Sequence, residues 1–221
     1  QGVEHYRRKL SGMNIAARRD EILTSSMVMR DYLSDVANQA GKTAMVIGGR
    51  ALESEMARVP LTVLKGDEGR RAQVVVAGWD TRLTYDKLKN ACLAIGNGAE
   101  FYATNDDATY PAPDGKWPGA GSIIAALNEA TGVKPVIIGK PHRPMMEAAL
   151  RRLTCPRSRA LIIGDRLDTD ILGGKRVGMA TCLVLTGVSS ARDLEEARFK
   201  PDMVVDDLMR LAEEIHDPPE G

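Results

Sequence analysis

Short apolar runs alternate with helical patterns along almost the whole chain, and this alternation limits the folds that are open to it. Residues 44–48, 73–77, 136–139 and 161–164 are rich in the branched apolar side chains typical of buried strands. The segments between them carry apolar residues three and four positions apart, as on one face of a helix. Strands separated by single helices are typical of a doubly wound parallel sheet, so we predict an α/β fold.

Further elements follow from the same patterns. Strands are expected at residues 21–24, 61–64, 101–104, 181–185 and 203–205. Helices are expected near residues 6–13, 25–36, 51–58, 84–97, 123–132, 146–153 and 208–215, with another that begins at Thr169. Two glycines inside that last helix, Gly173 and Gly174, are best explained by close approach of the helix to the sheet.

The composition argues against nucleic-acid and membrane partners. Thirty Lys and Arg residues balance thirty Asp and Glu residues, and no basic stripe is present. No apolar run approaches the length of a membrane span. The three cysteines, Cys92, Cys155 and Cys182, lie far apart in apolar or helical contexts, as is typical of thiols in a reducing compartment. We therefore expect a cytoplasmic protein.

Two acidic residues follow the strand expected at residues 161–164. Asp165 lies at the strand tip, and Asp170 falls in the first turn of the next helix. Carboxylates that converge at the carboxyl edge of an α/β sheet suggest a hard cation such as Mg²⁺. The alternative is that Asp168 or Thr169 merely caps the helix while Asp165 is a solvated loop acid.

Lys140 follows the tip of the strand expected at residues 136–139, as Asp165 follows the tip of another. We expect these two strands to be parallel neighbours in one sheet, which would bring both side chains to the same edge. A lysine ammonium is a compact charge suited to a phosphate or a carboxylate cluster. A solvated loop lysine is the alternative. Together with Asp170, the pair favours a phosphate-and-magnesium site.

Residues 104–115 form a polar segment with two prolines and a glycine, for which we expect a long loop. Ordered loops of this length are often functional. An ordinary series of Asx and proline turns would have the same composition, so composition alone does not decide between the two.

Five motifs occur in the order found in haloacid dehalogenase-like phosphatases. They are Thr104-Asn105-Asp106, Gly119-Ala120-Gly121, Ile138-Gly139-Lys140-Pro141, Gly164-Asp165 with Thr169-Asp170, and Leu185-Thr186-Gly187-Val188-Ser189. From about residue 6 to about residue 208 the chain resembles the NagD-like branch, subfamily IIA, which includes 4-nitrophenylphosphatases and phosphoglycolate phosphatases. The resemblance implies a Rossmann-like core, residues 1–40 and 132–221, with an inserted α/β cap of the C2 type at residues 41–131.

The resemblance also implies an activity, which is the hydrolysis of small phosphomonoesters with Mg²⁺ through an aspartyl-phosphate. Lys140 matches the lysine that neutralises the nucleophile and the phosphate. Asp165 matches the metal-ligating aspartate, and Asp170 matches the acid that supports the metal. Charge neutralisation and positioning are what phosphoryl transfer requires.

The cap and the partners are implied in the same way. Asn105 and Asp106 lie in the segment that matches the part of the cap facing the active site, and Tyr110 occupies a substrate-facing position. With Lys140, these residues would bind the substrate. The expected partners are a small phosphorylated metabolite and a second copy of the chain, bound through the cap as a homodimer, with no nucleic acid and no membrane.

One departure from the family is severe. The first family motif, Asp-x-Asp-Gly-Thr/Val, which carries the nucleophile, does not occur in the 221 residues, and neither does the hydroxyl-bearing second motif. In the family both precede the helix that matches residues 6–13. We therefore expect a truncated core without its first strands, an inactive chain, and an open apolar gap that favours self-association. The alternative function is a non-catalytic remnant that binds phosphorylated ligands or mediates oligomerisation.

Overall fold

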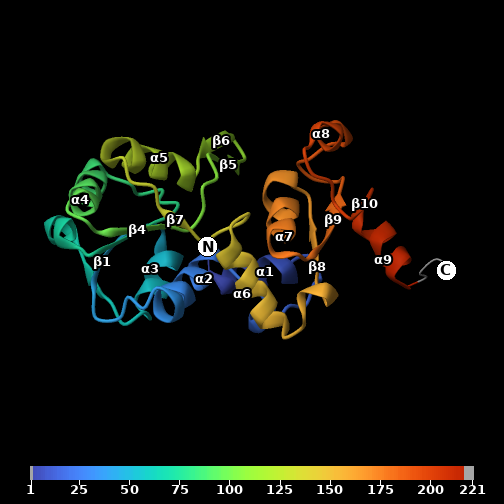
Figure 1. Ribbon diagram of the computed structural model, residues 1–221, viewed down its shortest axis with the longest axis horizontal. Coiled ribbons are helices and arrows are strands. Elements are labelled where there is room, and N and C mark those ends of the chain that lie inside the picture. The colour runs from blue at the N-terminus through green and yellow to red at the C-terminus, as the bar shows by residue number, and fades with distance from the viewer. Residues whose placement is uncertain (1, 217–221) are drawn as a thin grey trace. The chain divides into compact units, whose positions relative to one another are not determined.

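Two parallel sheets carry the helices of the protein (Figure 1). The computed structural model describes residues 2–216 and divides between Gly139 and Lys140 into two units, here called unit 1 and unit 2. Each unit pairs a parallel sheet with helices, so the predicted α/β fold is confirmed. The finer division into residues 1–40, 41–131 and 132–221 stays a prediction.

Unit 1 contains a five-stranded parallel sheet with the order β2-β1-β3-β4-β7. Its strands are β1 (Thr43–Ile47), β2 (Thr62–Leu64), β3 (Val74–Ala77), β4 (Glu100–Ala103) and β7 (Val136–Ile137). Helix α3 (Arg50–Met56) joins β1 to β2 on one face, whereas α4 (Tyr85–Gly96) and α5 (Ala120–Thr131) cover the other face (Figure 1). The strand order reverses between β1 and β3, which makes this point the topological switch of the sheet.

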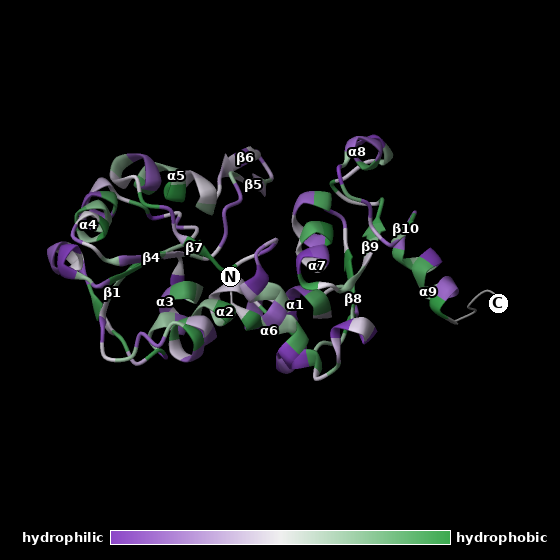
Figure 2. Cartoon of the chain, in the orientation of Figure 1, coloured by the Kyte–Doolittle hydropathy of each residue, from purple (hydrophilic) through white to green (hydrophobic). Residues whose placement is uncertain are grey.

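The core of unit 1 forms because strand and helix faces are both apolar. All four residues of β3 are buried, as expected for a central strand covered on both faces. Helices α4 and α5 carry both hydrophobic and hydrophilic residues (Figure 2). Ala91 and Ile95 of α4 are buried in one cluster, with Leu88 and Cys92 packed against it. These four residues therefore lie in an apolar core of unit 1 that also includes residues of α5.

The N-terminal part of unit 1 differs from the prediction. Helix α1 (Val3–Ser11) is present, but the strand expected at residues 21–24 is wrong, because residues Arg19–Glu21 form a 3₁₀ turn. The Glu21 carboxylate accepts a 2.7 Å hydrogen bond from the Arg18 N–H and closes that turn. Thr24 then caps α2 (Ser25–Asp31), which continues as a π-turn over Tyr32–Val36.

The segment after β4 contains a hairpin where we expected only a loop. Strands β5 (Thr109–Ala112) and β6 (Gly115–Pro118) pair antiparallel with Tyr110 opposite Trp117. Alternation of apolar and polar residues over so short a stretch is weak, and two prolines obscured it. The remaining elements of unit 1 are a 3₁₀ helix at Gly66–Arg71 and the loops.

Unit 2 contains a three-stranded parallel sheet with the order β10-β9-β8. Its strands are β8 (Leu161–Gly164), β9 (Ala180–Val184) and β10 (Met203–Val205). Its helical elements are α6 (Arg143–Leu153), a 3₁₀ turn at Arg157–Arg159, a π-turn at Leu167–Ile171, α7 (Leu172–Val177), α8 (Ala191–Glu196) and α9 (Leu208–His216).

The prediction that the strands at residues 136 and 161 are parallel neighbours is wrong. Strand β7 pairs with β4 in unit 1, and β8 pairs with β9 in unit 2. The connection from β4 to β7 runs through the β5–β6 hairpin and α5 and returns the chain beside β4.

Successive residues of β9 point to opposite faces of the sheet in unit 2. Cys182 and Val184 pack with Leu211 of α9, whereas Leu183 packs with Ile171 on the other face. A Cβ at Gly174 would lie 2.5 Å from Ile162 and 2.7 Å from Thr181, so the predicted close approach of α7 to the sheet is confirmed.

Two simple expectations can be checked within residues 2–216. No helix there is both long and apolar enough to cross a membrane. All three cysteines are free thiols.

Candidate active site

Lys140 and Asp170 form an ion pair in unit 2. The Lys140 Nζ lies 2.5 Å from Oδ1 of Asp170. The side chain of Asp170 is only 7% exposed, whereas that of Lys140 is 43% exposed. A buried carboxylate requires such a partner, because burial without one is costly. Lys140 is therefore paired, in contrast to the solvated-loop alternative.

The strand tip of β8 is shaped to receive Asp170. Asp170 lies in the π-turn and donates its backbone N–H to the Arg166 carbonyl at 3.1 Å. A Cβ at Gly164 would lie 2.6 Å from Oδ2 of Asp170, so only glycine lets the carboxylate lie against the strand end. Because Asp165 follows Gly164 directly, the fold brings the second predicted acid to the same tip.

Asp165 is held by the loop that follows β9. Its Oδ2 accepts a 2.9 Å hydrogen bond from the Val188 N–H, and its carbonyl oxygen accepts another of 2.9 Å from the Ser189 N–H. The Ser189 hydroxyl accepts a 3.1 Å bond from the Leu167 N–H. Gly187 lies so close to the Asp165 side chain that a Cβ there would overlap it. Asp165 is thus fixed in place.

Sequence reasoning assigned no role to Gly187, Val188 or Ser189. Their motif was among those that carry the family resemblance, and this was the signal that could have pointed to them. Two of the three contacts to Asp165 come from backbone N–H groups, which have no side-chain signature.

Asp168 does not cap the helix that follows β8, in contrast to the alternative interpretation. The exposed Asp168 pairs with Arg166 at 2.8 Å, and this hydrogen bond, with the charge of the guanidinium, lowers the pKa of the Asp168 carboxyl. The π-turn has no side-chain cap.

The two carboxylates are suited to a magnesium ion. Mg²⁺ is commonly held by one or two protein carboxylates together with water and substrate phosphate oxygens. Asp165 and Asp170 supply this number, and among residues 2–216 no donor contacts Oδ1 of Asp165. The same residues contain no cluster of three or more His, Cys, Asp or Glu side chains arranged for a metal.

The other predicted site residues lie in unit 1, at the carboxyl end of its sheet. Asn105 is half-buried after β4, and its amide contacts the position of Gly139. Asp106 is exposed. Two hydrogen bonds fix the segment between β4 and β5. The Gly119 N–H donates to the Ala108 carbonyl at 2.9 Å, and the Gly121 N–H donates to the Asp107 carbonyl at 2.8 Å.

Tyr110 stacks on a residue that sequence reasoning missed. The ring centroids of Tyr110 and Trp79 lie 4.2 Å apart, and the ring planes are 23° from parallel. Trp79 follows β3, about thirty residues earlier in the chain, so only the folded structure brings the two rings together.

Several curated proteins of similar sequence carry the name of a phosphatase. A family described as HAD-hydrolase-like matches residues 137–211. An acid sugar phosphatase of Staphylococcus saprophyticus is 37% identical over 207 residues, which cover 94% of this chain and 78% of the relative. An acid sugar phosphatase of Staphylococcus epidermidis is 38% identical over 200 residues, 90% of this chain and 75% of the relative.

Solved structures of the same fold include named phosphatases. A hypothetical protein from Pyrococcus horikoshii superposes with a TM-score of 0.91 at 42% identity, covering 97% of this chain and 83% of that chain. A p-nitrophenyl phosphatase from Archaeoglobus fulgidus superposes with a TM-score of 0.87 at 30% identity, covering 96% and 82%. A 4-nitrophenylphosphatase from Thermotoga maritima gives 0.87 at 33% identity, covering 96% and 79%.

Proposed function

The chain belongs to the NagD-like branch of the haloacid dehalogenase-like phosphatases, and from this membership we propose that it serves the hydrolysis of small phosphomonoesters. Relatives are named acid sugar phosphatase and p-nitrophenyl phosphatase. Sugar phosphates and aryl phosphates are accordingly the substrate classes we propose for this protein.

The arrangement of Lys140, Asp165 and Asp170 carries the proposal. The ammonium of Lys140 lies against Asp170, and Asp165 is held beside Gly164 with one carboxylate oxygen free of hydrogen bonds from residues 2–216. Asp165 and Asp170 would hold Mg²⁺, which would supply positive charge to the phosphate oxygens. Lys140 would neutralise further charge on the phosphate.

The nucleophile is a separate question. The family mechanism uses an aspartate in an Asp-x-Asp-Gly motif, and the 221 residues contain no such motif. We propose that these residues supply the metal-binding and charge-neutralising groups, and that they do not turn over substrate without a segment that bears the motif. Residues 41–131 would form the cap, in which Asn105, Asp106 and Tyr110 bind substrate.

The deciding experiment compares two proteins with 4-nitrophenyl phosphate. The 221-residue chain should release no nitrophenol above the blank, with or without Mg²⁺. A protein extended upstream by a segment that contains Asp-x-Asp-Gly should be active, and EDTA should abolish its activity. Turnover by the 221 residues alone would refute the assignment of the nucleophile. Inactivity of both, with phosphate still bound, would favour the non-catalytic alternative.

A further inference from the structure

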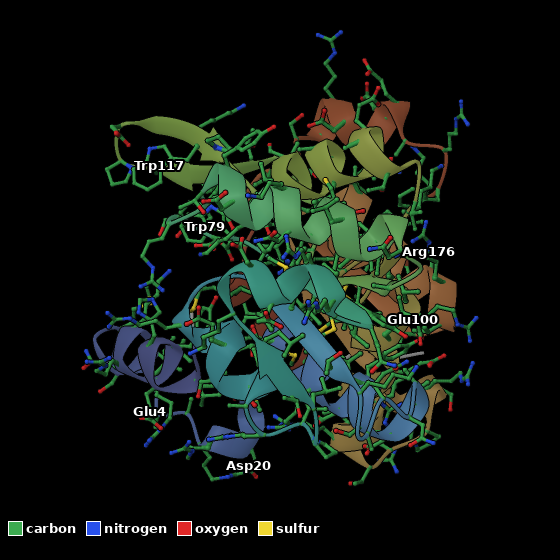
Figure 3. All side chains as sticks on the ribbon, turned by 90° about the vertical axis from the view of Figure 1, so that its left-hand side faces the viewer. Glu4, Asp20, Trp79, Glu100, Trp117 and Arg176 are labelled. Carbon is green, nitrogen blue, oxygen red and sulfur yellow. The ribbon has the colours of Figure 1, made fainter. Side chains whose placement is uncertain are left out.

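A groove in unit 1 lies at the amino ends of three neighbouring strands, β1, β3 and β4. It is lined by residues 42, 70–73 and 97–100 and is here called the amino-edge groove. Its volume is about 330 Å³, at the small end of the range for ligand pockets. In Figure 3, Glu100 at the amino end of β4 and Trp79 beyond the carboxyl end of β3 lie toward opposite sides of the view.

The lining of the amino-edge groove is positively charged. Lys42, Arg70 and Arg71 contribute three positive charges and Glu100 contributes one negative charge, which leaves a net charge of +2. Helix α4 ends at the groove, and its dipole adds only about half a negative charge there. Because the whole chain has no net charge, this positive charge is a local feature.

The carboxylate of Glu100 already has its partners. Its Oε1 accepts a 2.6 Å hydrogen bond from the Lys42 ammonium. Its Oε2 accepts bonds of 2.6 and 2.8 Å from the Tyr102 hydroxyl and the buried Gln39 amide. The hydrogen bonds from Lys42 and Tyr102 lower the pKa of the Glu100 carboxyl, which is therefore ionised. Since Lys42 and Glu100 neutralise each other, the two arginines carry the net charge of the groove.

Both arginines and one amide can donate to a ligand. Arg70 is exposed and forms no ion pair within residues 2–216. Arg71 pairs with Glu68 at 3.3 Å, but both side chains are exposed, and such a pair contributes little stability. Oε1 of Gln73 accepts a 3.2 Å bond from the Thr43 N–H, and this orientation leaves the amide N–H groups of Gln73 for a ligand.

Backbone hydrogen bonds hold the walls of the groove. The Glu100 N–H donates to the Gln73 carbonyl at 2.9 Å, and the Gln73 N–H donates to the Thr43 carbonyl at 3.0 Å. These bonds join the starts of the three strands to one another. A site that is ordered before binding loses less conformational entropy when a ligand arrives.

The donor groups of the groove indicate the chemistry of its ligand. Guanidinium groups bind carboxylates and phosphates through pairs of parallel N–H···O bonds. We propose that the amino-edge groove binds a small oxyanion with two or more negative charges, a phosphate compound or a polycarboxylate. Arg70 and Arg71 contact the oxyanion, and Gln73 donates a further hydrogen bond. The inference goes beyond the proposed function, because every contact comes from unit 1 and none from Lys140 or Asp165.

Isothermal titration calorimetry of the 221-residue chain tests the inference. Pyrophosphate, citrate and acetate are titrated in a buffer freed of metal ions on a chelating resin. Pyrophosphate, citrate or both should bind at one site per chain. Acetate, with a single charge, should bind about tenfold more weakly or not at all. The comparison of pyrophosphate with citrate separates the phosphate source of the oxyanion from the carboxylate source.

Variants of the two arginines locate the site. Arg70→Gln and Arg71→Gln should each weaken binding by about tenfold or more, as for the loss of a hydrogen bond to a charged group. Arg70→Lys should retain part of the affinity, because it keeps the charge but loses the planar fork. Arg82→Gln is the matched control, since Arg82 is 57% exposed in unit 1 and follows the carboxyl end of β3. Circular dichroism establishes that each variant is folded.

Absence of binding by both pyrophosphate and citrate would overturn the inference. An affinity that Arg70→Gln and Arg71→Gln leave unchanged, or that Arg82→Gln lowers equally, would also overturn it. Binding lost in Lys140→Ala but kept in Arg70→Gln would assign the anion to the candidate active site and would equally overturn the inference. The proposed function would survive each of these results, because the assay with 4-nitrophenyl phosphate tests it separately.

Discussion

Oδ2 of Asp165 accepts a 2.9 Å hydrogen bond from the backbone N–H of Val188, and this bond joins the tip of β8 to the loop after β9. A backbone donor occupies one carboxylate oxygen and leaves the other for a ligand. A backbone N–H in the loop after the neighbouring strand thus orients the candidate metal ligand. Hydrogen-bond partners behind metal ligands commonly have this role.

Asp165→Asn separates the charge of this side chain from its shape. The amide oxygen of asparagine can still accept the bond from Val188, so we expect the fold to be retained. The affinity for Mg²⁺ should fall by about tenfold or more, because a hard cation prefers a charged oxygen ligand. Isothermal titration with MgCl₂ measures the affinity for Mg²⁺, and Asp168→Asn is the control. Equal losses in the two variants would show that Asp165 is not a specific ligand.

Gly187→Ala tests whether the loop positions Asp165. A Cβ at residue 187 would overlap the Asp165 side chain, so the carboxylate must move. We expect a loss of about 1–3 kcal/mol in the free energy of unfolding together with weaker Mg²⁺ binding. Gly96→Ala is the control, because the space around Gly96 is open. Unchanged Mg²⁺ affinity in Gly187→Ala would contradict the positioning role.

Lys140→Ala leaves the buried Asp170 carboxylate without its ammonium partner. We expect the free energy of unfolding to fall by about 1–3 kcal/mol, since the pair is partly open to solvent. In an active, extended protein, kcat should fall by on the order of 10²-fold or more.

The control is Arg143→Ala, which removes an exposed ion pair with Glu147. In urea denaturation it should lower the free energy of unfolding by only about 0–0.5 kcal/mol. Cys155→Ser should leave kcat unchanged. Wild-type kcat in Lys140→Ala would make Lys140 a structural residue only.

Most helices and strands could be predicted from the sequence, because each depends on the periodicity of its own residues. The run from Leu161 to Asp170 was predicted as a strand tip followed by a helical turn, and the structure has both. Strand pairing was harder. The place of β7 beside β4 depends on the crossover through α5, which a local pattern does not encode. The wrong strand at residues 21–24 was too short for its period to be decisive.

The candidate site likewise has a part that the sequence predicted and a part that it did not. Asp165, Asp170 and Lys140 were predicted from side-chain type at strand tips. The groups that hold them were missed, because the Val188 N–H looks like any other backbone amide in a sequence. The stacking of Tyr110 on Trp79 was missed for another reason, since it joins strand β5 to the loop after β3, and only the folded unit 1 brings these two segments together.

Asp202 should make stability depend on pH in the acidic range. Hydrogen bonds from Lys175 and Thr181 lower the pKa of Asp202 from 3.8 to about 2. A carboxyl with a depressed pKa stabilises the fold fully above its unfolded value, and that stabilisation is lost as the pH falls from 3.8 toward about 2. The difference between wild type and Asp202→Asn in urea midpoint should therefore be constant above about pH 5 and shrink toward about pH 2. A difference that grows on acidification would refute the prediction.

The open edge of β8 should drive self-association of the chain. Strand β8 is the last strand of its sheet, and Ile163 in its middle is 44% exposed. Large apolar side chains of α9, Leu208, Met209 and Ile215, are also exposed. An unpaired strand edge with apolar side chains invites pairing with another chain.

Sedimentation velocity should show oligomers whose fraction rises with protein concentration. Ile163→Lys should reduce that fraction, because a charge on an edge strand opposes pairing. Val133→Lys is the control, since Val133 is similarly exposed but lies in unit 1 outside any strand. A monomer at all concentrations, or equal effects of the two lysine variants, would rule out the β8 edge as the contact.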